Sequence, residues 1–406
     1  MLRGADPDIL LLSQVFPPAV GGSGEMLENV YSRITAVPVR VWIDGATSGG
    51  TDETRGSMRI RRTTLDGRYW GVLDPKGMRQ HLRLGRDLIR ALRERPTIVH
   101  CGRAQPEGLP ALLARRLAPH APYLFWVYGD DIATALTSRD FSWTMRRVHA
   151  GASLAVAITR NSADVLAAQG FDADRIRVVY PGVDSDRFHP QLNARELRER
   201  FGADPGRLLL SVGRLQRRKG HDMVLAAMHA LRMELPDLVY VVVGDGAERA
   251  RLEALTRELQ LERRVHFEGE VAPRLLPLYY AVSDVFVLPT RVDAGDFEGF
   301  GLVFLEAGAT AKPVIGGRTG GVPEAVADGQ TGLLVDPTDT RALAAALRTL
   351  VTDPVLRRQF GGAARARVCR DFTWARAAEA VLAIHRDLAR ASGRSYAPLS
   401  RDVRAS

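Results

Sequence analysis

Short apolar runs alternate with helix-compatible stretches along almost the whole chain, and this alternation limits the folds open to it. In the first half the runs lie at 9–12, 37–43, 97–101, 122–127, 153–158 and 176–179, with helical patterns such as 77–94 and 107–118 between them. A second series follows at 208–212, 238–243, 265–267, 285–288, 314–315 and 333–335. Strands that alternate with helices form parallel sheets covered by helices on both faces. The pattern therefore predicts an α/β protein with two doubly wound, Rossmann-like domains in tandem.

A segment rich in turn-forming residues, 180–190, separates the two series. At 406 residues the chain also exceeds what one hydrophobic core usually serves. We predict an N-terminal domain at 1–190 and a C-terminal domain at 191–372. A long helix at 373–391 is expected to cross back to the first domain, and 392–406 to form a loosely held tail.

Cysteine usage and the distribution of apolar residues bear on the compartment. Cys101 and Cys369 lie far apart and lack a metal-ligand spacing, which argues against a disulfide framework or a structural zinc. No run reaches the roughly 18 apolar residues of a membrane-spanning helix, and the first run, 9–12, is too short for a signal peptide. We expect a cytoplasmic protein, at most peripheral at the inner face of the membrane.

Positive charge is concentrated in the first half of the chain. The formal net charge is +9, and between Arg55 and Arg116 there are 15 lysines and arginines against five acids. Such an excess suits nucleic acid, an anionic lipid surface or a phosphorylated substrate. No nucleic-acid reader motif is present, so no nucleic acid is expected. The arginines of 77–94 fall mostly outside its apolar stripe, which fits either a membrane-surface helix or a core helix with a solvated face. Peripheral contact with anionic membrane through 55–116 is the partner prediction.

The most informative motif joins an apolar strand to a helix at 296–307. Glu298 is expected just before the helix N-terminus, and Glu306 about one and a half turns inside it. Gly299 and Gly301 let a ligand approach the backbone, and the free N–H groups of the first helical turn can bind sugar hydroxyls or phosphate oxygens. A carboxylate accepts two hydroxyl hydrogen bonds, which suits a sugar or ribose diol.

A basic loop follows the first strand of the second series. Arg214 and Lys219 stand there, outside the carboxyl end of a strand, where open α/β sheets bind ligands. Two cations can neutralise a diphosphate whose negative charge grows as a glycosidic bond breaks. Arg217 or Arg218, in the same loop, are alternative phosphate contacts. A basic loop that only faces solvent is the alternative without a function. The glycine turn at 315–324, which ends in Glu324, is a third candidate that can face an anion.

At this point the chain resembles the retaining glycosyltransferases of GT-B architecture, glycosyltransferase group 1 or family 4, which include phosphatidylinositol mannosyltransferases. The resemblance spans nearly the whole chain, and its motifs occur in the family's order. They are the Phe16-Pro-Pro-Ala-Val-Gly-Gly22 loop, Pro181-Gly-Val-Asp-Ser-Asp-Arg-Phe188, Gly213-Arg214 with Lys219-Gly220, Glu298 with Glu306, and Gly321-x-Pro-Glu324.

The resemblance implies two domains facing across a cleft and a metal-independent transfer that retains the anomeric configuration without a protein nucleophile. It also implies that no cofactor is needed, because the nucleotide sugar is a substrate. Arg214 and Lys219 would hold the donor diphosphate, Glu298 the transferred sugar and Glu306 the ribose. The full donor set implied is Gly22, Arg214, Lys219, Glu270, Val271, Glu298, Phe300, Gly301, Leu302 and Glu306.

One segment departs from the family pattern. Members usually carry a histidine after an N-domain strand, whereas this chain reads Trp126-Val-Tyr128-Gly-Asp130-Asp131. Tyr128 does not titrate near neutrality, so this position lacks the proton-handling group that the histidine supplies. We predict that Tyr128 and Asp130 contact the acceptor and that Asp130 takes part in catalysis.

Other features have plainer interpretations. Gly244-Asp-Gly246 is half a dinucleotide fingerprint and equally a tight turn, and the acidic pairs at 184–186 and 6–8 are expected to be turn residues rather than metal ligands. His100 and Cys101, at a strand end, are expected to be packed and inert.

The predicted reaction moves a hexosyl group from GDP-mannose or a UDP-sugar to a lipid, saccharide or small-molecule acceptor. Local similarity favours mannosyltransferases of cell-envelope polysaccharide or glycolipid assembly. A nucleotide-sugar epimerase-like GT-B enzyme, a basic nucleic-acid-binding protein and a nicotinamide-dependent oxidoreductase are the alternatives.

Overall fold

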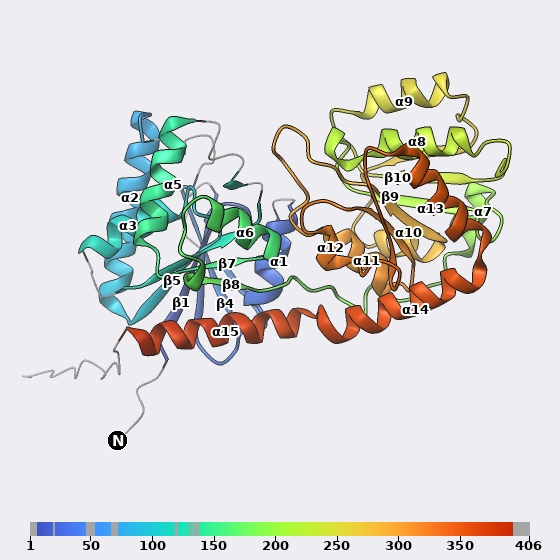
Figure 1. The fold of residues 1–406 in the computed structure, drawn as a ribbon. Coiled ribbons are helices and arrows are strands. Elements are labelled where there is room, and N and C mark those ends of the chain that lie inside the picture. The colour runs from blue at the N-terminus through green and yellow to red at the C-terminus, as the bar shows by residue number, and fades with distance from the viewer. Residues whose placement is uncertain are drawn as a thin grey trace, which may run out of the picture. The chain divides into compact units, whose positions relative to one another are not determined.

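The computed structural model describes residues 6–18, 21–45, 53–65, 72–117, 121–129, 131–132 and 138–392. It divides into two compact units, each with its own parallel sheet. The N-terminal unit comprises Met1–Ile158, Ala163–Val179 and the chain from Ala377 onward, and the C-terminal unit comprises Thr159–Ser162 and Tyr180–Arg376. The expected fold class, two Rossmann-like α/β halves, is confirmed (Figure 1).

The N-terminal unit is built on an eight-stranded sheet of order β3-β4-β2-β1-β5-β6-β7-β8, in which β3 alone is antiparallel to its neighbour. The central strands β1, β5, β6 and β7 read as buried apolar runs because helices cover both faces of the sheet there. The strand bounds are β1 Asp8–Ser13, β2 Val39–Asp44, β3 Glu53–Arg55, β4 Met58–Thr63, β5 Thr97–Cys101, β6 Tyr123–Val127, β7 Leu154–Ala157 and β8 Ile176–Val178.

Three helices cover one face of this sheet, and their apolar sides pack on alternate strand residues. Figure 1 shows α2 (Pro75–Glu94), α3 (Gly108–Leu117) and α5 (Arg139–Gly151) side by side, and their buried residues share one core with Leu10, Leu12 and Cys101. On the other face, residues of α1 (Gly22–Tyr31) and α15 (Trp374–Ala391) contact β5, where His100 meets Tyr31 and His385. The unit is completed by α6 (Arg160–Ala168), most of which belongs to it, and η1 (Ala173–Arg175).

The C-terminal unit has a six-stranded, all-parallel sheet of order β11-β10-β9-β12-β13-β14. The strands are β9 Leu208–Val212, β10 Val239–Val243, β11 Val265–Gly269, β12 Val285–Leu288, β13 Val314–Gly317 and β14 Gly332–Val335. The helices are α7 Arg195–Phe201, η2 Arg217–Lys219, α8 His221–Ala230, α9 Arg249–Glu258, α10 Leu276–Val282, α11 Leu302–Ala309, α12 Val322–Ala325, α13 Thr340–Thr352 and α14 Pro354–Asp371.

In both units the first strand lies in the middle of its sheet, and the chain then adds strands on either side. The order of connection reverses between β1 and β5 in the first sheet and between β9 and β12 in the second. Loops leave such a reversal in opposite directions and open a crevice at the carboxyl ends of the two strands, where α/β proteins bind ligands. The topology therefore predicts one site per unit, after β1/β5 and after β9/β12.

Strands β3 and β4 escape sequence prediction. In β4 only Met58 and Ile60 are buried, and arginines alternate with them, so the apolar signal is two residues long. The strand forms because its backbone pairs with all six residues of β2. Within the described residues, no helix is long and apolar enough to cross a bilayer.

Candidate active site

The candidate site of the C-terminal unit lies at the reversal between β9 and β12. The loop after β9 carries Arg214, Arg218 and Lys219, and the loop after β12 carries Asp296 and Glu298. These two loops thus bring together the basic and acidic motifs predicted from sequence. Lys219 and Glu298 are separated by 79 positions in the chain and are joined by an ion pair.

A buried ion cluster forms the centre of this site. The Lys219 ammonium donates to Oε2 of Glu298, and Arg218 donates to the same oxygen at 3.0 Å. The guanidinium of Arg218 also contacts Asp296 at 2.9 Å. Burial by itself raises the pKa of Glu298, but the positive charges of Lys219 and Arg218 outweigh it and hold the pKa below its usual value. Burial lowers the pKa of Lys219, while the charge of Glu298 opposes that shift.

Two glycines make this cluster sterically feasible. Gly220, directly after Lys219, has φ of 74°, and a Cβ there would lie 2.2 Å from the carbonyl oxygen of Pro289. Gly301 has φ of 84° at the N-cap of α11, where a Cβ would meet the Phe304 ring at 2.5 Å. Only glycine takes such a left-handed conformation without strain at so close an approach. Larger residues would move Lys219 or the start of α11.

The other predicted donor-site residues of the C-terminal unit differ in exposure and in their contacts. Arg214 is exposed, and its charge acts on Lys219. Glu306 accepts a hydrogen bond from the buried Tyr280 hydroxyl at 2.6 Å, which orients its carboxylate. The backbone at 300–302 leads into α11, with the Phe300 side chain buried.

Two further predicted donor contacts, Glu270 and Val271, follow β11, near the edge of the sheet. Glu270 is exposed and Val271 is half-buried. The neighbouring glycine pair has a structural explanation. A Cβ on Gly244 would lie 2.1 Å from the Gly213 carbonyl oxygen, and the turn around Asp245 accepts the Leu215 N–H at 2.9 Å. The turn interpretation of Gly244-Asp-Gly246 accounts for these contacts.

Glu324 has a structural role that the sequence did not indicate. Its carboxylate accepts the backbone N–H groups of Arg160 and Asn161 at 2.8 and 2.9 Å, and the Tyr180 hydroxyl at 2.8 Å. Glu324 therefore ties the segment Thr159–Ser162 and Tyr180 together within the C-terminal unit. The expectation that the 315–324 turn presents an anion-binding nest does not extend to this carboxylate, which is itself the anion.

In the N-terminal unit, Arg103 connects the loop after β5 to the start of α1. Its guanidinium donates to the Ser23 hydroxyl at 3.2 Å and lies over the Tyr128 ring at 5.0 Å. Ser23 stands next to Gly22, the predicted donor contact, which is the first residue of α1. Burial raises the pKa of Tyr128 well above its usual value. Tyr128, at the position of the family's histidine, is therefore an un-ionised phenol whose ring contacts the Arg103 guanidinium.

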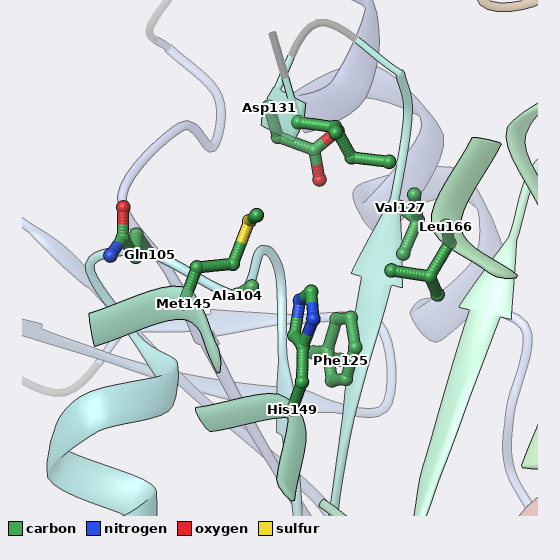
Figure 2. A pocket seen from close by; sticks show the side chains of 9 residues that line it. Ala104, Gln105, Phe125, Val127, Asp131, Met145, His149 and Leu166 are labelled. Atoms are coloured by element: carbon green, nitrogen blue, oxygen red, sulfur yellow. The ribbon is translucent and has the colours of Figure 1, made fainter. Parts of the chain in front are cut away.

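Asp130, predicted to contact the acceptor, lies outside the described residues. Its neighbour Asp131 accepts the N–H groups of Tyr128 and Gly129 at 3.2 and 2.8 Å, so it shapes the turn. Figure 2 shows Asp131 beside a small hollow that Met145 and His149 also line. The hollow measures about 10 Å³, the size at which a single water begins to fit, so it is a packing feature and not a substrate pocket.

Glu107 lies at the β1/β5 reversal and was not predicted from the sequence. It stands just before α3, is 1% exposed, and its Oε1 accepts the backbone N–H of Gln14 at 2.8 Å. Oε2 is buried without a hydrogen-bond partner among the described residues. Burial raises the pKa of Glu107 to about 7. A buried acid thus holds the start of the Phe16-Pro17-Pro18 loop at the β1/β5 reversal, and the signal for it was its place between a strand end and a helix start.

The strand-end pair His100 and Cys101 is packed, as expected. Both side chains are fully buried, and burial raises the pKa of the Cys101 thiol well above its usual value. His100 contacts Tyr31 at 2.8 Å and His385 at 3.2 Å, and His385 contacts the Pro7 carbonyl at 2.8 Å. Because that carbonyl can only accept, both imidazoles are satisfied in their neutral forms.

The described part of the chain contains no group of three or more His, Cys, Asp or Glu side chains arranged to hold a metal ion. Metal independence remains a prediction, because the described residues are not the whole chain.

Comparison with known proteins identifies the family of the chain. The family of glycosyl transferases group 1 matches residues 193–367, and glycosyltransferase family 4 matches residues 20–187. A GDP-mannose-dependent alpha-(1-6)-phosphatidylinositol monomannoside mannosyltransferase of Mycolicibacterium smegmatis is 33% identical over 67% of this chain and 72% of its own length. A D-inositol 3-phosphate glycosyltransferase of Streptomyces avermitilis is 36% identical over 59% of this chain and 53% of its own length.

Solved structures show the same fold. Anabaena HepE in complex with UDP has a TM-score of 0.77 at 20% identity and covers 94% of this chain and 100% of its own. A sucrose-phosphate synthase of Thermosynechococcus elongatus has a TM-score of 0.77 at 24% identity and covers 95% and 100%. The fold, the two family matches and the mannosyltransferase relative agree: the chain belongs to the group 1 glycosyltransferases and is an enzyme that transfers a sugar from a nucleotide-sugar donor.

Proposed function

We propose that the enzyme transfers a mannosyl group from GDP-mannose, with retention of anomeric configuration, to a hydroxyl of a lipid-linked or inositol-containing acceptor. The carrying observation is the ion cluster of Lys219, Arg218 and Glu298 at the β9/β12 reversal. The names of the relatives support the choice of donor and acceptor, since they describe GDP-mannose-dependent transfer to a phosphatidylinositol mannoside and glycosyl transfer to inositol 3-phosphate.

The proposed step breaks the bond between the sugar C1 and the diphosphate oxygen and forms a bond from C1 to the acceptor oxygen. Both electrons of the broken bond leave with the diphosphate, so its negative charge grows in the transition state. The departing oxygen takes the acceptor proton on the same face of the sugar. Proton and charge thus balance without a protein nucleophile, and front-face attack retains the configuration.

The basic loop supplies the stabilisation that this step needs. Glu298 holds Lys219 and Arg218 in place through ion pairs, so little reorganisation accompanies charge development. Cations fixed where charge develops in a water-poor site are worth more than mobile ones. We assign the diphosphate to Arg214 and Lys219, and add Arg218 to them because it shares the carboxylate with Lys219. Glu298 would contact the sugar, and Glu306 the ribose.

The N-terminal unit is assigned the acceptor. We propose that Tyr128 and Asp130 contact it and that Gly22 lies against the donor phosphates. Arg103 would set the orientation of Tyr128 through the cation–π contact. The phenol, buried and un-ionised, can donate a hydrogen bond but cannot act as a base, so the proton passes to the leaving phosphate.

Donor identity is tested by a thermal-shift comparison of GDP, UDP, GDP-mannose and UDP-glucose, followed by a transfer assay with phosphatidylinositol and with inositol 3-phosphate. We expect the largest shift with the guanine nucleotides, and a product whose one-bond C1–H1 coupling reports the α-anomer made from the α-linked donor. Larger stabilisation by uridine nucleotides would overturn the donor assignment, and an inverted product would overturn the mechanism.

We also propose that the N-terminal part of α2 docks on an anionic membrane. Leu73, Met78 and Leu82 are 82%, 37% and 56% exposed, and Arg79 and Arg83 are exposed beside them. Exposed apolar side chains flanked by arginines match an anionic lipid surface, into which the apolar groups insert while the cations meet headgroup phosphates. The buried face of α2 is made by other residues, among them Leu84 and Leu88.

Sedimentation with vesicles of phosphatidylglycerol and phosphatidylcholine tests the docking. Met78→Gln/Leu82→Gln is expected to lower the sedimented fraction several-fold while leaving the melting temperature unchanged. Met233→Gln removes an apolar side chain that is 85% exposed in the C-terminal unit, and serves as the matched control. Equal sedimentation of the two variants would refute the assignment of this surface.

A further inference from the structure

A second basic site lies at the opposite end of α2. A groove of about 330 Å³ runs between the strands β2 and β4 and the last turns of α2. That volume is within the range of about 300–1,000 Å³ that small-molecule sites occupy. Its walls carry five arginines and a buried tryptophan. They are Arg40, Trp42, Arg59, Arg61, Arg90 and Arg95.

Strand register brings these cations together. In the parallel pair β2/β4, Arg40 is opposite Arg59 and Trp42 is opposite Arg61, so all four side chains share one face of the sheet. The Arg61 guanidinium lies 5.4 Å from the centre of the Trp42 ring. Like charges directly opposite each other on a sheet are destabilising. The charge of Asp8 acts on both Arg40 and Arg59 and offsets part of this repulsion.

The acids of the groove offset only part of its charge, because five arginines face three carboxylates, Asp87 and Glu94 in the wall and the nearby Asp8. The charges of Asp8 and Glu94 both act on Arg40. Asp8 lies 3.7 Å from Arg40 and 4.0 Å from Arg95. The first distance is too long for a hydrogen bond, and the Arg40 Nε is buried without a hydrogen-bond partner among the described residues. Asp87 and Glu94 are the two carboxylates of the groove wall, and the nearest ion-pair partner of Asp87 is Arg86, 3.7 Å away.

Two of the arginines are exposed and available to a ligand. Arg59 and Arg90 make no hydrogen bond or ion pair within the described ranges, and each projects from a rigid element. Guanidinium groups bind phosphate through paired N–H donors. Two of them on facing elements, with Arg61 and Arg95 beside them, suit a ligand that carries more than one phosphate group.

The groove is distinct from the catalytic edge of its own sheet. Arg40 and Arg59 are each the second residue of their strand, and Arg95 precedes β5. They therefore stand at the amino ends of parallel strands, whereas the β1/β5 crevice opens at the carboxyl ends. A ligand here would not be the sugar donor at its reacting position.

We propose that the groove between β2, β4 and the C-terminal turns of α2 binds an anion with two or more phosphate groups, at a site separate from catalysis. The phosphates lie between Arg59 and Arg90, and Arg40 and Arg95 supply further positive charge from the floor. Such a ligand is either a soluble polyphosphorylated compound or the phosphorylated headgroup of a lipid. The two share the chemistry that the groove recognises.

Isothermal titration of the full-length enzyme with inorganic pyrophosphate tests the site. Arg59→Ala/Arg90→Ala removes two groove cations, and Arg79→Ala/Arg83→Ala removes two exposed arginines from the other end of α2, so the variants are matched in charge. Because all three proteins keep the donor loop intact, any pyrophosphate bound there contributes equally. We expect the groove variant to lose one equivalent of binding or to weaken it at least tenfold, and the control to stay within twofold of wild type.

The source of the phosphates is decided by a second measurement. Wild type and the groove variant, both with Arg79 and Arg83 intact, are sedimented with phosphatidylcholine vesicles that contain phosphatidylinositol 4-phosphate. A headgroup ligand predicts that the groove variant sediments less than wild type and that pyrophosphate competes for wild type. A soluble ligand predicts unchanged sedimentation with lost pyrophosphate binding. Unchanged pyrophosphate binding in the groove variant, or an equal loss in the charge-matched control, would overturn the proposal.

Discussion

Replacing Lys219 by methionine tests the central ion cluster, because methionine keeps much of the side-chain length and removes the charge. Glu298 would then keep Arg218, at 3.0 Å, as its remaining cation partner. Breaking a fully buried pair costs about 3–5 kcal/mol. Because Arg218 still neutralises the carboxylate, we expect the free energy of unfolding to fall by less, roughly 1–2 kcal/mol.

The expected effect on catalysis is larger than the effect on stability. Lys219 is 8% exposed and fixed by its contact with Glu298. Removing one preorganised group that stabilises developing charge costs roughly 10²–10³-fold in rate, or about 3–4 kcal/mol. We therefore expect kcat to fall by this factor, with a smaller rise in the KM for the donor, because the charge on the diphosphate grows toward the transition state.

The assay is steady-state transfer from GDP-mannose, with the melting temperature measured in parallel. Arg217→Met is the matched control, since Arg217 lies in the same loop, is exposed, and makes no hydrogen bond or ion pair within the described residues. We expect it to retain activity within about threefold, as surface substitutions usually do. If Lys219→Met kept near-wild-type kcat, or if Arg217→Met lost as much, the reasoning from the buried cluster would be refuted.

Three further predictions follow from single features. The pKa of Glu107 is raised from 4.5 to about 7, so this group should destabilise the fold by up to roughly 3 kcal/mol as pH rises from 4.5 to 7; melting curves of Glu107→Gln should lack that decline, and an identical pH profile would contradict it. Burial lowers the pKa of His149 to about 4, so the stability that the neutral imidazole gives the fold is complete above pH 6.5 and is lost as pH falls toward 4. The His149 ring stacks on Phe125 with 4.9 Å between the ring centres, so His149→Phe should fit there, and its melting temperature should depend less on acid than that of wild type. Transfer activity should survive saturating EDTA, and recovery that requires added Mg²⁺ or Mn²⁺ would show that a metal takes part.

Much of the architecture could be predicted from local pattern. The runs in β9, β10 and β12 are continuous and apolar because both faces of a parallel sheet are covered, and that signal is strong in a single sequence. Strand β4 lacked the signal, because its arginines line an open groove and only Met58 and Ile60 reach the core. Pairing with β2 determines its conformation, and pairing is a long-range property.

The candidate site was predictable to the level of the loops that form it. Glu298 and Lys219 stand in motifs that mark a strand end, and the structure joins them. The part played by Arg218 was not predictable, because Arg217 and Arg218 are adjacent and chemically identical. The short helical turn η2 aims Arg218 at Glu298 and leaves Arg217 exposed.

Patterns within a few neighbouring residues suffice to predict the two-unit α/β plan, the loops that carry the chemistry and the family, because apolar periodicity and turn residues act over short stretches of chain. Which side chains share a charge depends on the three-dimensional arrangement. Glu298 is 80 residues from Arg218, and Arg40 meets Arg59 only through the register of β2 on β4. Contacts of this kind depend on how strands that are distant in the chain pair in the sheets, and this pairing cannot be predicted from a few neighbouring residues.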